Sequence, residues 1–277
     1  MNADHIPAAF ARIAGSTALC RLLHLDVCAS TQAVAGELVA AGASPYTIVL
    51  TNEQTAGRGT HGRQWLHQGS NGLAVSVIVP CPPRVDHEPW VTVAAAVACA
   101  QALRGVVLPL PRLKWPNDIV IAQRKVGGVL AELVQEPRLM IIGLGLNLHS
   151  VPETDPSLPA TAVAHWSTQT IRREQILESW LLELYHLLTY LKRGRVDVIR
   201  EAWHLLLDTT GRRVTVTLDG QELTGLATAV DSKGALIVRP DGGGTIRVQP
   251  GGAAIIRHIS QSTAATTRRR RSRPGGD

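Results

Sequence analysis

The sequence predicts an α+β fold: a large domain with a mixed sheet and flanking helices, followed by a small C-terminal β-barrel. Up to about residue 208, short β-branched or apolar runs alternate with segments long enough for packed helices, which is typical of a sheet covered by helices. After Gly211, apolar residues instead alternate with polar ones, the period of half-buried strands. We therefore expect a first domain over residues 1–208 and an all-β domain over residues 209–260.

The composition is that of a folded chain without a membrane span. Of the 277 residues, 45% are hydrophobic and 18% are charged, which excludes a disordered protein. The longest candidate, residues 90–103, covers 14 positions and contains Thr92 and Gln101. A membrane span needs about 18 or more, so no membrane association is expected.

The elements of the large domain follow from local signals. Residues 12–28 mix strand and turn signals, and Ser30 and Thr31 can cap a helix that ends at Gly42. Further helices are expected at 90–103, 177–191 and 196–207. Strands are expected at 47–52, 72–79, 112–121, 125–134 and 139–148. Residues 54–65 are rich in glycine and residues 150–169 in proline, so both are expected to be loops.

In the C-terminal part, Asp219-Gly220 is a hairpin-turn signal. Strands are expected on both sides of it and beyond, at 214–218, 223–230, 235–239 and 245–248. Residues 261–277 are expected to form a disordered, arginine-rich tail. Residues 268–277 hold five Arg and one Asp of a chain whose net charge is +6, which leaves +2 for the other 267 residues. The folded part is therefore not strongly basic, and a nucleic-acid arm is the less favoured reading of the tail.

The cysteines and the N-terminus favour a cytoplasmic protein. The four cysteines form no CxxC pair, which is typical of small buried thiols in a reducing compartment. Asp4 and His5 stand where a secretory signal would carry basic residues. We therefore expect a cytoplasmic location.

The first stretch of candidate functional residues runs from Gly57 to Gly62. It has the letters of a GxGxxG dinucleotide motif, but no crossover helix follows it. A flexible loop that carries Arg58, His61 and Arg63 beside glycines suits a carboxylate or a phosphate. The alternative is a glycine-rich surface turn.

The second stretch, Lys114 to Asp118, has the sequence Lys-Trp-Pro-Asn-Asp. Pro-Asn-Asp predicts a tight turn between strands, from which Asp118 projects. A carboxylate beside an amide suits a magnesium ion that also holds substrate phosphates. The alternative is a turn with solvated charges.

Two further stretches place glycines in strands beside polar groups. Lys125 enters a strand at Gly127-Gly128, and the strand from Gly143 carries a second glycine and ends at Asn147. Missing side chains let a ligand approach the backbone, although close packing is an alternative reason for such glycines. Only four of the 28 basic residues are lysines, so two lysines eleven positions apart suggest a need for ammonium groups.

Together, the four stretches resemble the biotin–protein ligases in order and spacing. The similar segments are Ser30-Thr31, Gln54 to Gly59, Lys114 to Asp118, Lys125, and Gly143-x-Gly-x-Asn147. The resemblance covers about residues 25–150. It implies a class II synthetase-like biotin–lipoyl ligase catalytic domain, and it implies that the C-terminal β-barrel is of the SH3-like type.

The resemblance also implies roles for individual residues. The expected biotin contacts are Ser30, Thr31, Gln32, Gln54, Arg58, Gly59, Thr60 and Lys125. The expected ATP or adenylate contacts are Arg63, Trp65, Lys114, Asn117 and Asn147. The expected metal residues are Asp118 and Asn117, and the expected catalytic residues are Lys125 and Arg58. Gln32 stands where the family usually has Asn, and Thr60 stands where many members have a second arginine.

The implied reaction joins biotin to a specific lysine of a biotin carboxyl carrier domain, in acetyl-CoA carboxylase or a related carboxylase. It uses ATP and Mg²⁺ and passes through biotinyl-5′-AMP. A lipoate or octanoate ligase of the same fold is the nearest alternative. A ligase that also represses transcription needs a DNA-binding module, and 29 residues precede Ser30, too few for a helix-turn-helix domain with its connection. We therefore expect the monofunctional type, with no specific DNA binding.

Overall fold

The computed structural model describes residues 21–67, 69–152, 159–218, 221–250 and 255–258. The chain divides into two compact units, Met1–Asp208 and Thr209–Asp277. The predicted hairpin turn at Asp219-Gly220, the predicted tail and the first part of the predicted strand at 12–28 lie outside the described residues. Among the described helices, none has the length and apolar character of a membrane span.

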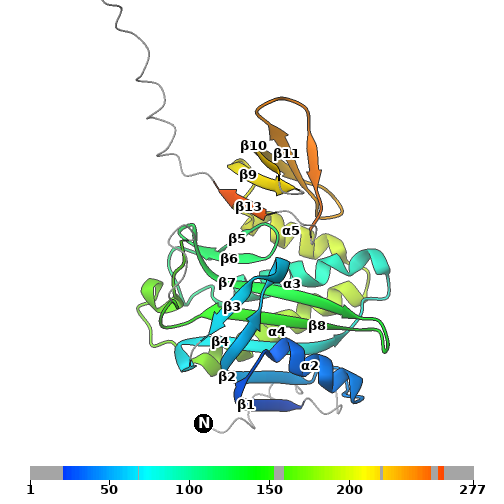
Figure 1. The fold of residues 1–277 in the computed structure, drawn as a ribbon, viewed down its shortest axis with the longest axis vertical. Helices are drawn as coiled ribbons and strands as arrows, with labels where there is room; N and C mark the ends of the chain where they lie inside the picture. The colour runs from blue at the N-terminus through cyan, green and yellow to red at the C-terminus, as the bar shows by residue number, and fades with distance from the viewer. Residues whose placement is uncertain (1–20, 68, 153–158, 219–220, 251–254, 259–277) are drawn as a thin grey trace, which may run out of the picture. The chain divides into compact units, whose positions relative to one another are not determined.

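A mixed sheet forms the framework of the first unit (Figure 1). Its strands are β1 (Leu22–Cys28), β2 (Ile48–Arg58), β3 (Gln64–His67), β4 (Gly72–Pro80), β5 (Arg112–Lys114), β6 (Asp118–Ile121), β7 (Arg124–Val134) and β8 (Leu139–Asn147). The strand order is β1-β2-β4-β8-β7-β6-β5, and β3 pairs with β2. β1 and β2 are parallel, whereas the other neighbours are antiparallel. The predicted α+β fold with a mixed sheet is confirmed.

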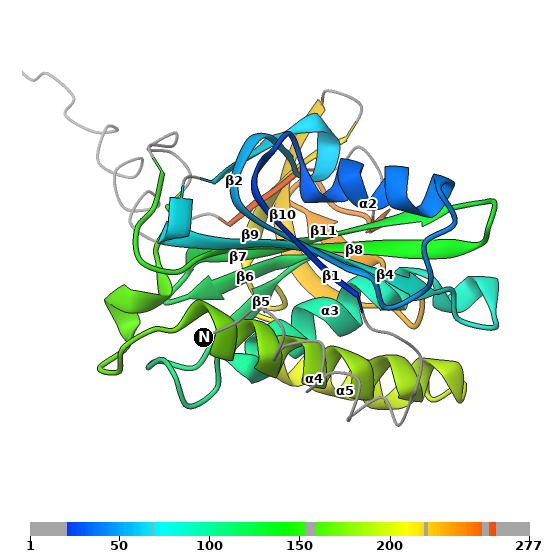
Figure 2. The same cartoon turned by 90° about the horizontal axis from the view of Figure 1, so that it is seen from below.

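Helices cover both faces of this sheet. They are α2 (Thr31–Ala40), α3 (Pro89–Ala102), α4 (Arg173–Lys192) and α5 (Val196–Leu206). Figure 2 shows α2 on one face and α3, α4 and α5 on the other. α3 is buried on nearly all sides, as its run of Ala and Val predicts for a helix packed between a sheet and other helices. The indole of Trp180 in α4 donates to the carbonyl of Ala95 in α3, at 3.1 Å.

Most predicted elements of the first unit are confirmed, with differences at β2, at residues 112–121 and at α4, which begins at Arg173 where the sequence predicted residue 177. β2 continues to Arg58, so the predicted glycine-rich loop starts inside a strand. This extension exists because β2 folds back onto β3, where Gly57 pairs with Trp65. The predicted strand at 112–121 is two strands, because a turn separates β5 from β6 and lets them pair with each other.

The second unit is an antiparallel sheet. Its strands are β9 (Arg213–Leu218), β10 (Gln221–Val230), β11 (Leu236–Pro240), β12 (Ile246–Val248) and β13 (Ile255–His258), in the order β12-β11-β10-β9-β13. Val214 and Val216 are fully buried, as the two-residue period predicts. In the described part of this unit, β12 and β13 do not pair, so the structure has an open sheet where the sequence predicted a closed barrel.

Candidate active site

A pocket lies on the face of the sheet that carries α2, and it gathers residues from segments far apart in the sequence. Its walls come from the start of α2, the β2–β3 hairpin and the middle strands of the sheet. The residues that line it are Ser30, Thr31, Gln32, Gln54, Arg58, Gly59, Thr60, Trp65, Val75, Ser76, Asn117, Lys125, Gly128, Val129, Leu130, Gly143, Leu144 and Gly145. The eight predicted biotin contacts therefore lie around one pocket.

One end of the pocket presents hydrogen-bonding groups at the start of α2. The backbone N–H and the hydroxyl of Thr31 both donate to Gln54 Oε1, at 2.8 and 3.2 Å. Because the amide oxygen faces these donors, the NH₂ group of Gln54 is left to donate to a ligand. The Ser30 hydroxyl is buried and has no partner among the described residues. A buried polar group without a partner costs free energy, so these groups suit a polar ligand.

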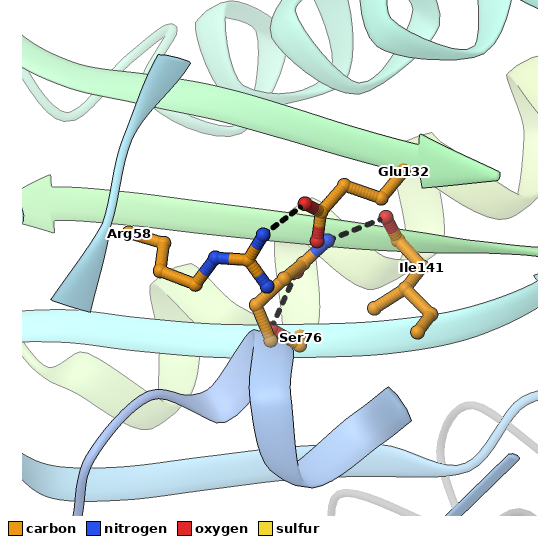
Figure 3. A network of polar contacts seen from close by, with 5 residues as sticks. Arg58, Ser76, Glu132 and Ile141 are labelled. Atoms are coloured by element: carbon orange, nitrogen blue, oxygen red, sulfur yellow. Dashed lines mark hydrogen bonds and ion pairs between the residues drawn. The ribbon is translucent and has the colours of Figure 1, made fainter. Parts of the chain in front are cut away.

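The floor of this end is a buried hydrogen-bond network, and Figure 3 draws its contacts at Ser76 and Ile141. The Ser76 hydroxyl lies 2.9 Å from Thr31 Oγ1 and 3.0 Å from Gln32 Oε1. The Gln32 amide also donates to the carbonyl of Ile141, at 3.0 Å. Both ends of the Gln32 amide therefore bind the protein itself. A Cβ atom on Gly143 would lie 2.7 Å from Gln32 Oε1, so the longer side chain at position 32 requires a glycine opposite it.

The other end of the pocket carries a cation and an aromatic ring. Lys125 Nζ lies 2.6 Å from Asp118 Oδ1 and 5.8 Å from the centre of the Trp65 ring. The Trp65 indole rests on the backbone of Gly145, where a Cβ atom would come within 2.4 Å of the ring. An ammonium group beside a flat aromatic surface can bind a phosphate next to a planar base.

Arg58 reaches across the pocket from the end of β2. Its guanidinium donates to Glu132 Oε1 at 2.6 Å, and Figure 3 shows the two side chains pointing toward each other. The pocket is open to solvent on one side, and this contact lies across it.

Two of the predicted nucleotide residues, Asn117 in the pocket and Asn147 beside it, hold neighbouring segments together. Asn117 Nδ2 donates to the carbonyl of Val129 at 2.5 Å, which ties the β5–β6 turn to β7. Asn147 Nδ2 donates to the carbonyl of Thr161 at 3.2 Å. Asn147 also lines a neighbouring polar pocket that Gln54 shares.

The remaining predicted residues lie around the same region. Arg63 is exposed, and its carbonyl accepts from the backbone N–H of Gly59 at 2.8 Å, which closes the loop. Lys114 pairs with Asp118 across the β5–β6 hairpin. No group of three or more His, Cys, Asp or Glu side chains in the described parts of the chain could hold a metal ion. Asp118 can still offer a single carboxylate to an ion whose other ligands are phosphates.

The sequence reasoning missed Ser76, Leu130 and Glu132. Leu130 and Glu132 follow Gly128 at the two-residue period of β7, so strand alternation could have placed them on the pocket face. Ser76 stands in an otherwise apolar strand, and a polar residue there is a signal of a buried hydrogen bond.

Residues 25–147 match the Biotin/lipoate A/B protein ligase family, and residues 209–257 match the Biotin protein ligase C terminal domain. The fold and pocket are therefore those of a ligase of the biotin and lipoate class. The chain belongs to the biotin protein ligase family.

Relatives and solved structures agree with this assignment. The chain is 32% identical to the Bifunctional ligase/repressor BirA of Bacillus subtilis, over 80% of this chain and 70% of the relative. It is 31% identical to the Biotin--[acetyl-CoA-carboxylase] ligase of Mycobacterium tuberculosis, over 84% of this chain and 89% of the relative. Its fold resembles the biotin protein ligase of Aquifex aeolicus in complex with biotin and ATP, with a TM-score of 0.73, 24% identity, and coverage of 86% and 99%.

Proposed function

We propose that the chain joins biotin to a specific lysine of a biotin carboxyl carrier domain in an ATP-dependent reaction. The observation that carries this proposal is the polarity of the pocket. One end offers the unpartnered Ser30 hydroxyl and the NH₂ group of Gln54, and the other offers the Lys125 ammonium. Biotin has a ring with a ureido group at one end and a carboxylate at the other. The names of the relatives support the same activity.

In the first step, an oxygen of the biotin carboxylate attacks the α-phosphorus of ATP. A phosphorus–oxygen bond to the leaving pyrophosphate breaks, and biotinyl-5′-AMP forms. Two unit negative charges about 4 Å apart repel by roughly 4 kcal/mol at an effective dielectric constant near 20. The Lys125 ammonium between carboxylate and phosphate reduces this repulsion, and catalysis rests on such positioning and charge neutralisation.

In the second step, the neutral ε-amine of the carrier lysine attacks the acyl carbon of biotinyl-5′-AMP. The bond between the acyl carbon and the phosphate oxygen breaks, AMP leaves, and the amine loses a proton to solvent as the amide forms. Neither step needs a nucleophile from the enzyme.

The biotin contacts divide along the pocket. Ser30, Thr31 and Gln54 would bind the ureido group and the valeryl chain. Gln32 would line the biotin pocket without a hydrogen bond to biotin, because its side-chain amide is already hydrogen-bonded to Ser76 and Ile141. Arg58, Gly59 and Thr60 would lie over the biotin and the adenylate.

The nucleotide would occupy the Lys125 end. Trp65 would pack near the adenine, Arg63 would support the loop, and Lys114, Asn117 and Asn147 would serve the phosphates and the nucleoside. Mg²⁺ reduces the negative charge on the phosphates when it is bound. Asp118, with the amide of Asn117 nearby, fits it as a partner because Mg²⁺ needs few protein ligands when phosphates supply the rest.

For the whole chain, we propose residues 1–208 as the catalytic domain, 209–260 as an SH3-like domain and 261–277 as a disordered tail. The antiparallel strands of the second unit support the SH3-like assignment. The partner is a carrier domain of acetyl-CoA carboxylase or a related carboxylase, and the place of action is the cytoplasm. We expect no specific DNA binding, although the Bacillus relative is named a ligase and repressor.

Mass spectrometry of a carrier domain tests this function. The domain is incubated with the protein, Mg-ATP and biotin, and in parallel a lipoyl domain is incubated with lipoate. We expect a biotin-sized mass gain on one carrier lysine that depends on ATP. A gain with lipoate alone would instead assign the chain to the lipoate ligases, and no gain with either would contradict a ligase function.

A further inference from the structure

The contact between Arg58 and Glu132 joins residues 74 positions apart in the sequence. The side chains are 52% and 32% exposed, and the nitrogen–oxygen distance is 2.6 Å. Ion pairs as exposed as this one contribute little net stability, because both charges remain partly solvated. The pair is therefore easily exchanged for another partner of Arg58.

The position of Glu132 separates it from the Lys125 end of the pocket. Gly128, Leu130 and Glu132 alternate along one face of β7, and Gly128 lies beside Lys125 Nζ and Asp118. The Cα atoms of Gly128 and Glu132 are four residues apart, which is about 13 Å in a strand. While its guanidinium binds Glu132, Arg58 is drawn away from the anionic groups that Lys125 would bind.

Arg58 is the one arginine or lysine between Gly57 and Gly62. Arg63 follows this segment and closes the loop through its carbonyl, which accepts from the Gly59 N–H. Of these two arginines, Arg58 is the one that lines the pocket. The partner of Arg58 thus decides how much positive charge residues 57–62 place on the ligand.

We propose that Glu132 is a competing counter-ion, which Arg58 must leave before it binds the carboxylate or phosphate of biotin and biotinyl-5′-AMP. This proposal rests on the proposed function, because it takes those ligands as the anions. Glu132 thereby sets how tightly the loop holds the intermediate. It acts through Arg58 as a positioning residue and takes no part in the chemistry.

The test measures the dissociation constant and the release rate of biotinyl-5′-AMP for the full chain and its variants. Glu132→Gln removes the charge at nearly constant shape, and Glu132→Thr removes it with a strand-favouring residue. Both should bind the intermediate about two- to five-fold more tightly and release it correspondingly more slowly, the range expected for an exposed ion pair. Asp86→Asn is the matched control, since it breaks an exposed pair with Arg84 and should change neither value.

A double-mutant cycle with Arg58→Ala separates this role from a structural one. In the Arg58→Ala background, Glu132→Gln should have no effect on binding of biotinyl-5′-AMP. Unchanged or weaker binding by Glu132→Gln in the wild-type background would overturn the proposal, as would an equal gain in both backgrounds. A wild-type chain that binds no biotinyl-5′-AMP would overturn the proposed function together with this inference, whereas binding independent of Glu132 would overturn this inference alone.

Discussion

At the scale of single residues, Lys125 carries the central argument. Its ammonium group lies at the end of the pocket where a carboxylate and a phosphate would meet, 2.6 Å from Asp118. A compact point charge fits between two anions better than a planar guanidinium fork. This explains a lysine in a chain that otherwise uses arginine for most of its cations.

Lys125→Arg should therefore reduce adenylation by about 100-fold or more, the usual cost of losing one group that stabilises developing charge. Biotin binding should change much less. Biotin-dependent pyrophosphate exchange measures the first effect and calorimetry with biotin the second. Lys192→Arg, in the last turn of α4, is the matched control, and near-wild-type exchange by Lys125→Arg would refute the assigned role.

Thr60 gives a second prediction at this scale. A threonine cannot supply a cation over the intermediate, so Thr60→Arg should add one and slow the release of biotinyl-5′-AMP. Rapid filtration after a single round of adenylation measures the release rate. If wild type and variant release the intermediate equally fast, the loop does not hold its ligand through charge at position 60.

At the scale of elements, strand β8 makes the pocket possible. Gly143 and Gly145 share one face of this strand, opposite Leu130 and Gly128 of β7. Their missing side chains leave space for the Gln32 amide at one end and the Trp65 ring at the other. The strand thus forms the floor of the pocket through its backbone.

Gly145→Ala should displace Trp65, because a Cβ atom there would come within 2.4 Å of the indole ring. We expect a several-fold rise in KM for ATP and a smaller change for biotin. Gly36→Ala in α2 is the matched control, since its nearest neighbour would be 3.9 Å away and alanine favours a helix. An unchanged KM for ATP in Gly145→Ala would show that Trp65 does not contact the nucleotide.

Ser76 connects strand β4 to the polar end of the pocket. Ser76→Ala would leave the buried Gln32 amide oxygen and the Thr31 hydroxyl without this partner. Losing such a hydrogen bond costs about 0.5–1.5 kcal/mol, so biotin affinity should fall roughly three- to tenfold with kcat nearly constant. Titration with biotin measures the affinity, and an unaltered value would mean that the network is only structural.

At the scale of the whole molecule, most of the net positive charge lies in the last residues of the sequence. Removing residues 261–277 lowers the formal net charge from +6 to +2. Binding to a polyanion such as heparin should then weaken and lose most of its salt dependence, while carrier biotinylation continues. A salt titration of heparin binding with both chains measures this. Equal binding by the two chains would place the polyanion surface on the folded units.

The sequence by itself determined the helices α2 to α5, the central strands and the four stretches that carry the chemistry. These follow from local signals: capping residues, glycine and proline punctuation, and the period of apolar residues. The extension of β2 to Arg58 was not predictable in this way, because it depends on pairing with β3. The closed barrel is not confirmed in the described residues, since alternation predicts strands but not whether the two end strands meet.

The tertiary structure alone decided which residues share the pocket. The sheet order brings β4, β8 and β7 together, so Ser76, Gly143 and Leu130 form one row across three strands. It likewise brings Arg58 to Glu132, a contact between residues that no local pattern connects. Strand pairing determines such contacts, and its free energy comes from hydrogen bonds and burial over the whole sheet. The local sequence pattern reflects only interactions between residues close in the chain, so it does not predict them.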